Sequence, residues 1–318
     1  MEYQESGVEK QSNPGSSDLP QSMRAIHAPR YGDAAVLQQV ETPLLDLEPD
    51  MVLVQPVASS LNVADWVMMR GYPLIVRAST GLFRPRDPRA GKDVAGVVVA
   101  VGAEVKAFRP GDEVFGLVRG AWADYVRARP AQLARKPEGL GFPEASCLPV
   151  AGLTALQGIR DCAGVSHGER VLIIGASGGV GHLAVQIARS LGAHVTAVCS
   201  GRNAEFVRSL GAEHVIDYTQ TDYTATGARY NVIYDLVGSA PLSDVLKLLG
   251  PDGRYQLDGG QFRGPVLGPM GRNIRASLRN RLGPQKLGSH HAQLKAEDLQ
   301  ALASMAETGI MRPQIEQR

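Results

Sequence analysis

A glycine-rich turn near the middle of the chain is the strongest candidate for chemistry. Residues 171–174 form a short apolar run, residues 175–181 form the turn, and an amphipathic helical pattern follows. Gly178 allows the backbone to approach a ligand, and Gly181 allows the helix to pack closely on the strand. Unpaired amides and the positive dipole end at a helix start can bind a pyrophosphate. The turn therefore predicts a dinucleotide site, although Ala176 replaces the first glycine of the usual G-x-G-x-x-G pattern.

The segments after this turn alternate between strand and helix patterns. Further strands are predicted at residues 194–199, 214–217, 230–238, 253–258 and 285–292, and helices at 203–211 and 241–249. Short connections between alternating elements imply right-handed crossovers and one parallel, doubly wound sheet. Ligands bind such sheets at the carboxyl ends of the strands, where the glycine turn lies.

The end of the second predicted strand bears on which dinucleotide binds. An acidic residue there would hold the adenosine ribose and repel a 2′-phosphate. The stretch Cys199-Ser200-Gly201-Arg202-Asn203 has no carboxylate. Ser200 stands about where the acid would be, and the Arg202 guanidinium suits a phosphate. We therefore expect NADPH rather than NADH; the alternative is that Arg202 is an ordinary surface arginine.

The first half of the chain has the pattern of a small β domain. Short apolar runs at residues 36–40, 51–57, 94–101, 113–118 and 123–128 are separated by Pro, Gly and Asp turns. Many short strands without helical spacing predict a compact, partly open β barrel. Residues 143–163 read as helices that join this barrel to the parallel sheet, and we expect a substrate cleft between the two units.

These patterns divide the 318 residues into four segments. We predict a disordered leader at 1–22, a barrel domain at 23–145, a dinucleotide-binding domain at 146–292 and a segment at 293–318 that returns towards the barrel. The formal net charge of +1 argues against nucleic-acid binding. No apolar run is long enough for a membrane span, and three cysteines without CxxC spacing are typical of buried thiols in a reducing compartment. We expect a cytoplasmic protein.

Several segments, taken in order, carry a family resemblance. They are Leu61-Asn-Val-Ala-Asp-Trp66, Arg70-Gly-Tyr-Pro73, Gly91-Lys-Asp-Val-Ala-Gly-Val-Val-Val-Ala-Val-Gly102, Phe108-Arg-Pro-Gly-Asp-Glu-Val-Phe-Gly116, Leu148-Pro-Val-Ala-Gly-Leu-Thr-Ala155, the glycine turn, Val215-Ile-Asp-Tyr218 and Tyr234-Asp-Leu-Val-Gly238. Over residues 23–318 the chain resembles the medium-chain dehydrogenase/reductase superfamily, in particular its zinc-independent quinone oxidoreductase branch. The resemblance implies an α/β protein with an N-terminal GroES-like barrel and a Rossmann sheet.

The sequence predicts that no metal is bound. Where zinc enzymes of the superfamily carry Gly-His-Glu, this chain has Gly91-Lys92-Asp93, and no cysteine precedes Cys147. Catalytic and structural zinc sites need such ligands. For a site without a metal, hydride addition to an electron-poor alkene or quinone is easier than oxidation of an alcohol. The reason is that the negative charge appears on a conjugated oxygen.

The resemblance also suggests catalytic residues in the barrel. Tyr72 matches the position where the resembling enoyl reductases place a catalytic tyrosine, whose phenol could donate a proton. Asn62 and Asp65 could hold the nicotinamide ribose or a substrate oxygen. The alternatives are that Tyr72 only packs a loop, and that Asn62 and Asp65 stabilise a turn and cap a helix that begins near Asp65.

Cofactor contacts are carried over by position. The resemblance places Thr154 near the nicotinamide and the pyrophosphate at Ala176, Ser177, Gly178, Gly179, Val180 and Gly181. It places the 2′-phosphate and adenosine at Ser200, Arg202 and Tyr218, and the nicotinamide half along Val237, Gly238, Leu257 and Gly259. Tyr218 has a structural alternative as an aromatic residue that ends a strand.

The chain stops at Arg318, whereas resembling proteins continue for several tens of residues that return to the barrel. We therefore expect an apparently truncated C-terminus. Either the chain closes differently, a partner subunit covers the gap, or the product is truncated and impaired. By analogy, a homodimer through the edge of the sheet is possible.

The leading functional prediction is an NADPH-dependent, zinc-independent oxidoreductase. It would deliver hydride to a quinone or to an α,β-unsaturated ketone or aldehyde, with a small-molecule substrate and neither nucleic acid nor membrane as partner. Two alternatives stay open. One is a non-catalytic NADPH-binding sensor or scaffold, and the other is a biosynthetic tailoring enzyme, such as a cyclase, on the same fold.

Overall fold

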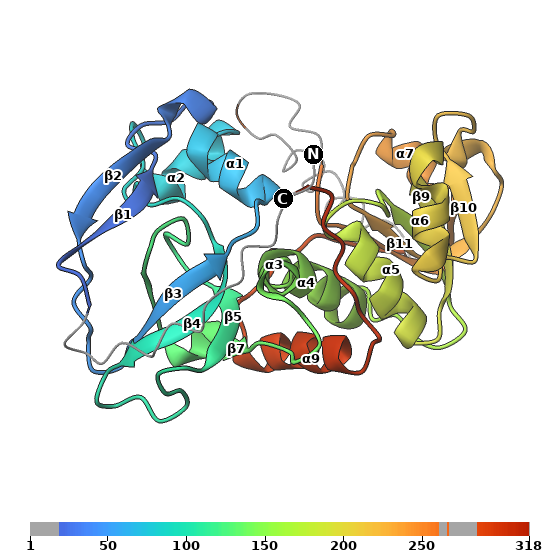
Figure 1. Ribbon diagram of the computed structural model, residues 1–318. Coiled ribbons are helices and arrows are strands. Elements are labelled where there is room, and N and C mark those ends of the chain that lie inside the picture. Colours follow the sequence, from blue (N-terminus) through green and yellow to red (C-terminus); the bar gives the residue numbers. More distant parts are fainter. Residues whose placement is uncertain (1–18, 261–265, 267–284, 318) are drawn as a thin grey trace, which may run out of the picture.

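Two lobes lie side by side in the computed structural model, which describes residues 19–260, 266 and 285–317 (Figure 1). Strands β1 to β7 form one lobe and strands β8 to β13 form the other, and helices α3, α4 and α9 lie between them (Figure 1). Most of the predicted leader, residues 1–18, lies outside the described residues.

The first lobe is built from antiparallel strands. A two-stranded sheet pairs β1 (Ser22–His27) with β2 (Gln38–Pro43). A five-stranded sheet has the order β6 (Val126–Ala128), β3 (Val52–Ala58), β4 (Asp93–Val101), β5 (Glu113–Leu117) and β7 (Leu133–Arg135). Strand β4 is apolar almost throughout because both of its faces are buried: Val94 and Val98 pack inside this lobe, whereas Ala95 joins the core shared with the second lobe.

Short helices complete this lobe. They are α1 (Val63–Arg70), α2 (Arg77–Thr80) and the 3₁₀ turns Ala34–Val36, Leu74–Val76 and Pro130–Gln132.

The second lobe contains one parallel sheet of six strands. Its order is β10 (His214–Asp217), β9 (His194–Cys199), β8 (Arg170–Ile174), β11 (Tyr230–Asp235), β12 (Leu249–Leu257) and β13 (Lys286–Gly288). Its helices include α5 (Gly181–Ser190), α6 (Ala204–Ser209) and α7 (Leu242–Leu246), with 3₁₀ turns at Gly201–Asn203 and Tyr223–Ala225. The chain order reverses between β8 and β11, and ligands bind doubly wound sheets at such a switch point.

Both faces of this sheet are covered. Along β8, Val171 and Ile173 face one hydrophobic cluster, whereas Leu172 and Ile174 face the other. Burial on both faces explains why this strand reads as a continuous apolar run. The predicted fold, a GroES-like barrel followed by a Rossmann sheet, is confirmed.

The two lobes share a hydrophobic core around the central helices. These helices are α3 (Phe142–Ser146), α4 (Pro149–Leu156), the π-helix Gln157–Cys162 and α9 (Ala296–Glu307). One cluster contains Phe115 of β5, Leu153 of α4, Leu183 of α5 and Leu302 of α9, all fully buried. The position of one lobe relative to the other is therefore set by side-chain packing.

Several predicted elements differ from the structure in type or extent, among them the strand predicted at 253–258, which begins at Leu249, and the strand predicted at 230–238, which ends at Asp235. The strand predicted at 36–40 begins at Gln38, because the Asp33 carboxylate accepts from the amide of Ala35 and caps a 3₁₀ turn over 34–36. The helix predicted at 241–249 ends at Leu246, since strand β12 begins at Leu249. The strands predicted at 285–292 and 123–128 are limited to three residues each, where a neighbouring strand pairs with them.

The packing of α9 generates a prediction about stability. A Cβ atom at Gly152 would lie 2.9 Å from Leu302 Cδ1, so α9 lies directly on α4. Leu302→Ala leaves a cavity in the shared core and should lower the free energy of unfolding by about 2–5 kcal/mol. Ser304→Ala, on the exposed side of the same helix, is the matched control. Denaturant unfolding followed by circular dichroism measures both; equal stability of the two variants would contradict this packing.

Candidate active site

The glycine turn joins β8 to α5, and no side chain fits where the start of the helix meets the end of the strand. A Cβ atom at Gly181 would lie 2.1 Å from the carbonyl oxygen of Gly175, so the helix begins in contact with the end of the strand. Gly175 adopts a φ of 88°, in the left-handed region that favours glycine. Its amide and that of Ala176 donate to the Val198 oxygen at 3.0 and 3.1 Å, which ties the turn to β9. The turn is thus fixed on its inner side.

The outer side of the turn is open. A Cβ atom at Gly179 would meet nothing within 4 Å, and at Gly178 it would meet only the Gly175 oxygen, at 3.4 Å. Within the described part of the chain, no acceptor is found for the amides of Ser177, Gly179 or Val180. Helix starts leave such amides unsatisfied, and anions bind there. The shape and the donors of the turn both fit a pyrophosphate.

The predicted adenosine-binding residues come together beside this turn. Ser200 follows β9, and Arg202 is exposed on the 3₁₀ turn that comes next. The Asn203 side chain donates to Ser177 Oγ at 3.0 Å and so joins this segment to the glycine turn. Tyr218 follows β10 and is 57% exposed. Its backbone amide donates a hydrogen bond to the Cys199 oxygen at 3.1 Å.

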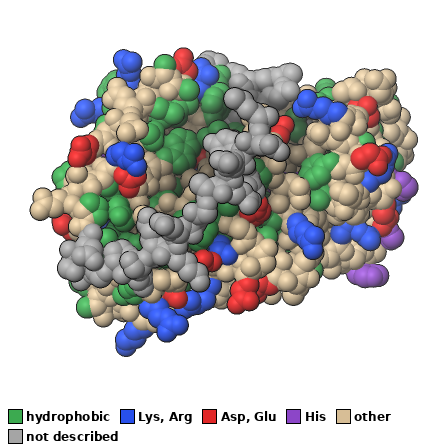
Figure 2. Space-filling view, in the orientation of Figure 1, with side chains coloured by type: hydrophobic (Ala, Val, Ile, Leu, Met, Phe, Trp, Pro, Cys, Tyr) green, Lys and Arg blue, Asp and Glu red, His purple; other side chains and the backbone are tan. Residues whose placement is uncertain are grey.

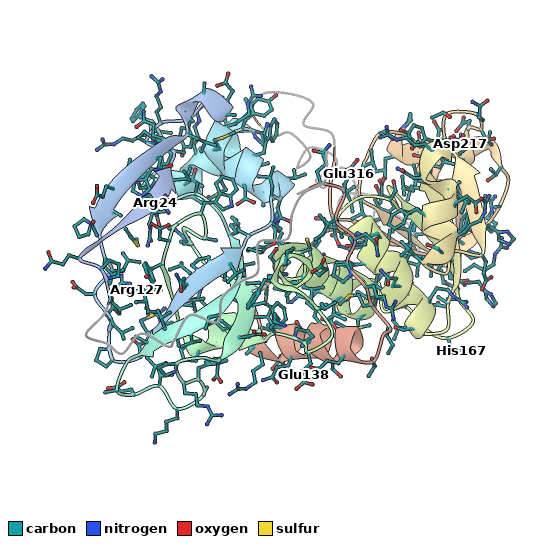
Figure 3. All side chains as sticks on the ribbon, in the orientation of Figure 1. Arg24, Arg127, Glu138, His167, Asp217 and Glu316 are labelled. Carbon is teal, nitrogen blue, oxygen red and sulfur yellow. The ribbon has the colours of Figure 1, made fainter. Side chains whose placement is uncertain are left out.

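Asp217 is a residue of this region that the sequence analysis missed. It ends β10 opposite Cys199, and a Cβ atom at Gly201 would lie 2.3 Å from its Oδ2. Its Oδ1 accepts from the Thr219 amide at 2.9 Å and the Thr219 hydroxyl at 2.7 Å, and these hydrogen bonds lower its pKa. A carboxylate therefore lies beside a segment that has none of its own (Figure 3). The clue in the sequence was the position of Asp217 at the end of the neighbouring strand.

The segments after β11 and β12 lie together, as the predicted nicotinamide contacts require. The amides of Val237 and Gly238 donate to Oδ1 of the fully buried Asp235 at 3.0 and 2.7 Å. A Cβ atom at Gly259 would lie 2.1 Å from a backbone oxygen of the chain that follows β11. Leu257 is buried at the end of β12. Thr154 lies on α4, and its hydroxyl donates within the helix to the Val150 oxygen at 2.7 Å.

In the barrel, Asn62 and Asp65 stabilise the start of α1. Asn62 is the N-cap residue, and its backbone amide donates to Asp65 Oδ2 at 2.9 Å. The capping role considered for this pair is therefore observed. Burial raises the pKa of Asp65. Tyr72 follows Gly71 beyond the other end of this eight-residue helix, so the helix separates it from Asn62 by roughly 12 Å.

The side-chain amide of Asn62 is also held in place, by hydrogen bonds to two other residues. Its Nδ2 donates to Oδ2 of the buried Asp93 at 2.8 Å and to Ser60 Oγ at 3.2 Å. Leu61 and Val63, on either side of Asn62, are 76% and 65% exposed. Figure 2 shows hydrophobic side chains gathered on the hollowed face of this lobe. An anchored amide thus lies among apolar side chains, an arrangement suited to a ligand that is partly polar and partly apolar.

Comparison with known proteins covers both lobes. Residues 48–138 match the alcohol dehydrogenase GroES-like domain, and residues 179–280 match the zinc-binding dehydrogenase family. The chain is 37% identical over 242 residues to the chloroplast envelope quinone oxidoreductase homolog of Arabidopsis thaliana, a match that covers 69% of this chain and 70% of the relative. It is 35% identical over 240 residues to the 2-methylene-furan-3-one reductase of Solanum lycopersicum, which covers 70% of this chain and 59% of the relative.

Among solved structures, the quinone oxidoreductase of Coxiella burnetii superposes with a TM-score of 0.79 at 30% identity, covering 93% of this chain and 90% of that one. The chain belongs to the zinc-independent quinone oxidoreductase branch of the medium-chain dehydrogenase/reductase superfamily. It is an oxidoreductase by family, which confirms the resemblance seen in the sequence.

The position that carries zinc ligands in other members of the superfamily has a different chemistry in this oxidoreductase. Asp93 accepts hydrogen bonds from Ser60, Asn62 and the amide of Val150. Among the described residues, no group of three or more His, Cys, Asp or Glu side chains is arranged to hold a metal. No helix in the same part of the chain has the length and apolar character to cross a bilayer.

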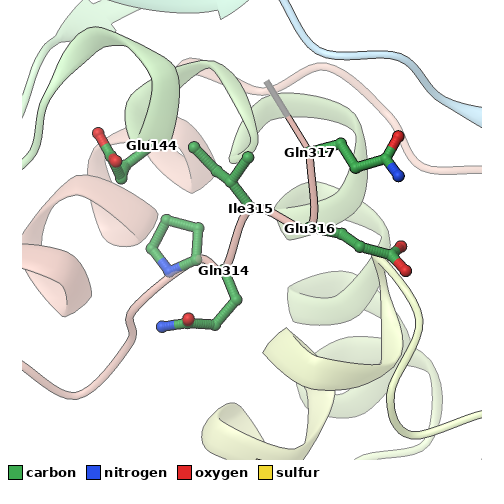
Figure 4. A pocket seen from close by; sticks show the side chains of 6 residues that line it. Glu144, Gln314, Ile315, Glu316 and Gln317 are labelled. Atoms are coloured by element: carbon green, nitrogen blue, oxygen red, sulfur yellow. The ribbon is translucent and has the colours of Figure 1, made fainter. Parts of the chain in front are cut away.

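The C-terminal segment lies beside the start of α5, a contact that the sequence did not predict. His182, in the first turn of α5, has Nδ1 3.0 Å from the Gly178 oxygen, and its Nε2 accepts from the Gln314 amide at 3.2 Å. This pairing fits a neutral imidazole, and burial lowers its pKa. Glu144 and residues 313–317 line a cavity of about 320 Å³ (Figure 4), and Glu316 lies between the lobes (Figure 3).

The two sides of the glycine turn give a paired prediction. Gly181→Ala places a methyl group against the Gly175 oxygen, so it should lower the free energy of unfolding by about 1–3 kcal/mol and weaken dinucleotide binding. Gly179→Ala fills only open space, so it should keep the wild-type stability but weaken dinucleotide binding. Thermal unfolding and nucleotide titration of both variants measure these effects. Undiminished nucleotide binding by Gly179→Ala would show that the pyrophosphate does not lie on this side of the turn.

Proposed function

We propose that this oxidoreductase uses NADPH to deliver hydride to a quinone or an α,β-unsaturated carbonyl compound. The observation that carries the proposal is the open glycine turn, whose unpaired amides lie at the start of α5. The names of the Arabidopsis and tomato relatives, a quinone oxidoreductase homolog and a reductase of an unsaturated furanone, support this substrate class.

The residues of the sheet fit a bound dinucleotide along the carboxyl ends of the strands. When bound, NADPH supplies the hydride. Ser177, Gly179 and Val180 offer backbone amides to the pyrophosphate. The segments after β11 and β12 are joined by the Asp258 amide, which donates to the Asp235 oxygen, and by the close approach of Gly259, and in this proposal Val237, Gly238 and Leu257 would lie along the nicotinamide half.

The preference for NADPH rests on Arg202. Its guanidinium is exposed, and in the described ranges no carboxylate pairs with it. The nearby Asp217 carboxylate accepts hydrogen bonds from Thr219 in its own loop and from the backbone of Gly201, the residue before Arg202. Arg202, Ser200 and Tyr218 are therefore the groups that would surround a 2′-phosphate.

Replacing Arg202 tests this preference. Loss of a charge-assisted hydrogen bond to phosphate is worth about 1.5–3 kcal/mol. Arg202→Ala should therefore raise the dissociation constant for NADPH by about ten- to a hundredfold and leave that for NADH nearly unchanged. Arg208→Ala, which removes a guanidinium paired with Glu205 on the adjoining helix, is the control. Equal weakening of both nucleotides by Arg202→Ala would remove the assignment.

On the substrate side, the structure restricts what Asn62 can do. Its Nδ2 group already donates to Asp93 and Ser60, so any further hydrogen bond goes to its Oδ1, which has a second lone pair beside the capping bond to the start of α1. An acceptor suits a ribose hydroxyl of the cofactor and cannot stabilise a developing oxyanion. We assign Asn62 to the nicotinamide ribose and keep the phenol of Tyr72 as the proton donor to substrate.

Tyr72→Phe tests the proton donor. General acid catalysis contributes on the order of 10²–10⁴-fold, so turnover of enones should fall by about a hundredfold or more while the NADPH dissociation constant is kept. Tyr125→Phe removes a phenol elsewhere in the barrel and serves as the control. If Tyr72→Phe turns over at the wild-type rate, the proton comes from water or from another group.

The alternative functions give a different outcome in the same assay. A sensor or scaffold would bind NADPH without consuming it in the presence of quinones and enones. A cyclase would convert its substrate without net oxidation of NADPH. The homodimer through the sheet edge, the cytoplasmic location and the four domain boundaries stay predictions.

A further inference from the structure

Asp93 is a fully buried carboxylate where the two lobes meet. It is the first residue of β4, and it accepts a hydrogen bond from Asn62, the residue at the start of α1. A buried carboxylate has a large cost of desolvation, so its retention calls for a physical explanation.

Three donors from different segments converge on this carboxylate. Ser60 Oγ and Asn62 Nδ2, in the loop between β3 and α1, donate to its Oδ2 at 2.7 and 2.8 Å. The amide of Val150, in the first turn of α4, donates to its Oδ1 at 3.1 Å. The Ser59 hydroxyl donates at 2.6 Å to the backbone oxygen of Asp93 rather than to its carboxylate. One side chain therefore joins the barrel loop to the helix that carries Thr154.

We propose that Asp93 is a positioning residue whose carboxylate holds Asn62 and the first turn of α4 in the geometry that hydride transfer requires. The proposal rests on the proposed function, because Asn62 is there assigned to the nicotinamide ribose; Thr154, on the same α4 helix, is the residue that the family resemblance puts near the nicotinamide. Asp93 itself acts through these two groups and touches neither cofactor nor substrate.

The hydrogen-bond pattern suits the ionised form of the carboxylate. The Val150 amide, the Asn62 Nδ2 group and the Ser60 hydroxyl all donate to it. A proton on Oδ2 would reverse the Ser60 bond, because a hydroxyl both donates and accepts, and would replace the charge-assisted bonds from Asn62 and Val150 by weaker neutral ones. Protonation thus weakens the bonds that link the barrel loop to α4.

The surroundings place this protonation in the neutral range. The pKa of Asp93 is raised to about 7, because burial and, to a smaller extent, the charge of Asp65 outweigh the hydrogen bonds from Ser60, Asn62 and Val150, which lower it. The other charged and titratable groups on the elements packed around it are Lys92, the preceding residue, and Glu144 and Cys147 at the end of α3. A group with this pKa is about one-tenth ionised at pH 6 and about nine-tenths ionised at pH 8.

Stability and turnover should respond to this titration in opposite directions. The pKa of Asp93 is raised on folding, so the contribution of this group to stability is full below the unfolded value near 4 and decreases as pH rises towards 7. Turnover, in contrast, needs the ionised form and should increase over the same interval. A residue that only stabilised the fold would change the stability with pH but leave the ratio of wild-type to variant kcat constant.

The test compares the wild type with Asp93→Asn between pH 5 and pH 8.5. The ratio of wild-type to variant kcat for an enone should rise about tenfold from pH 6 to pH 8, because the variant cannot ionise. Over the same range the wild-type midpoint of thermal unfolding should fall relative to that of the variant. A kcat ratio that stays constant with pH, in an active wild-type enzyme, overturns the proposal. A wild type that consumes no NADPH at any pH instead refutes the proposed function.

A second pair of variants keeps the proposal falsifiable if Asp93→Asn does not fold. Ser60→Ala removes a hydrogen bond that lowers the Asp93 pKa, so the rise in kcat should move to higher pH. At pH 7 this variant should be severalfold slower than the wild type, and the two should converge near pH 9. Ser59→Ala removes a bond to the backbone of Asp93 and should leave the transition in place. Equal pH profiles for Ser60→Ala and the wild type overturn the proposal.

Discussion

The contact between Gly181 and the Gly175 oxygen is the constraint on which the site depends. Any side chain at residue 181 would push α5 away from β8, because its Cβ would lie 2.1 Å from that oxygen. The close approach directs the free amides of Ser177, Gly179 and Val180 to one open face. Ala176 in place of the usual first glycine does not disturb this geometry, since its own amide donates to β9 and its side chain is buried.

The second lobe alone does not make an active site, because a nicotinamide needs a wall on its other side. In the proposed function that wall is the barrel, whose position is fixed by a hydrophobic core continuous from Phe115 through α4 to Leu302. Asp93 adds a polar connection at the same junction. Apolar packing sets where the lobes lie, whereas hydrogen bonds to one carboxylate set how individual side chains are oriented. The cost of burying that carboxylate is a reason to connect it with function rather than with stability alone.

Much of the fold could be predicted from the sequence because its periodicities are local. Strand β9 was predicted with its observed bounds, since 194–199 is an apolar run buried on both faces. The start of β2 and the end of α7 were predicted wrongly, because an Asp33 cap and the pairing of Leu249 with β11 decided them. The contacts of Asp217 and Asp93 and the His182–Gln314 bond could not be found in this way. Each depends on residues that only the tertiary structure brings together.

The most direct measurement is calorimetric titration of the purified full-length chain with NADPH and with NADH. The account predicts saturable binding of one NADPH per chain, with a dissociation constant on the order of micromolar, and weaker binding of NADH. Folded protein that binds neither nucleotide would contradict the assignment of the glycine turn as a pyrophosphate site and, with it, the enzymatic function.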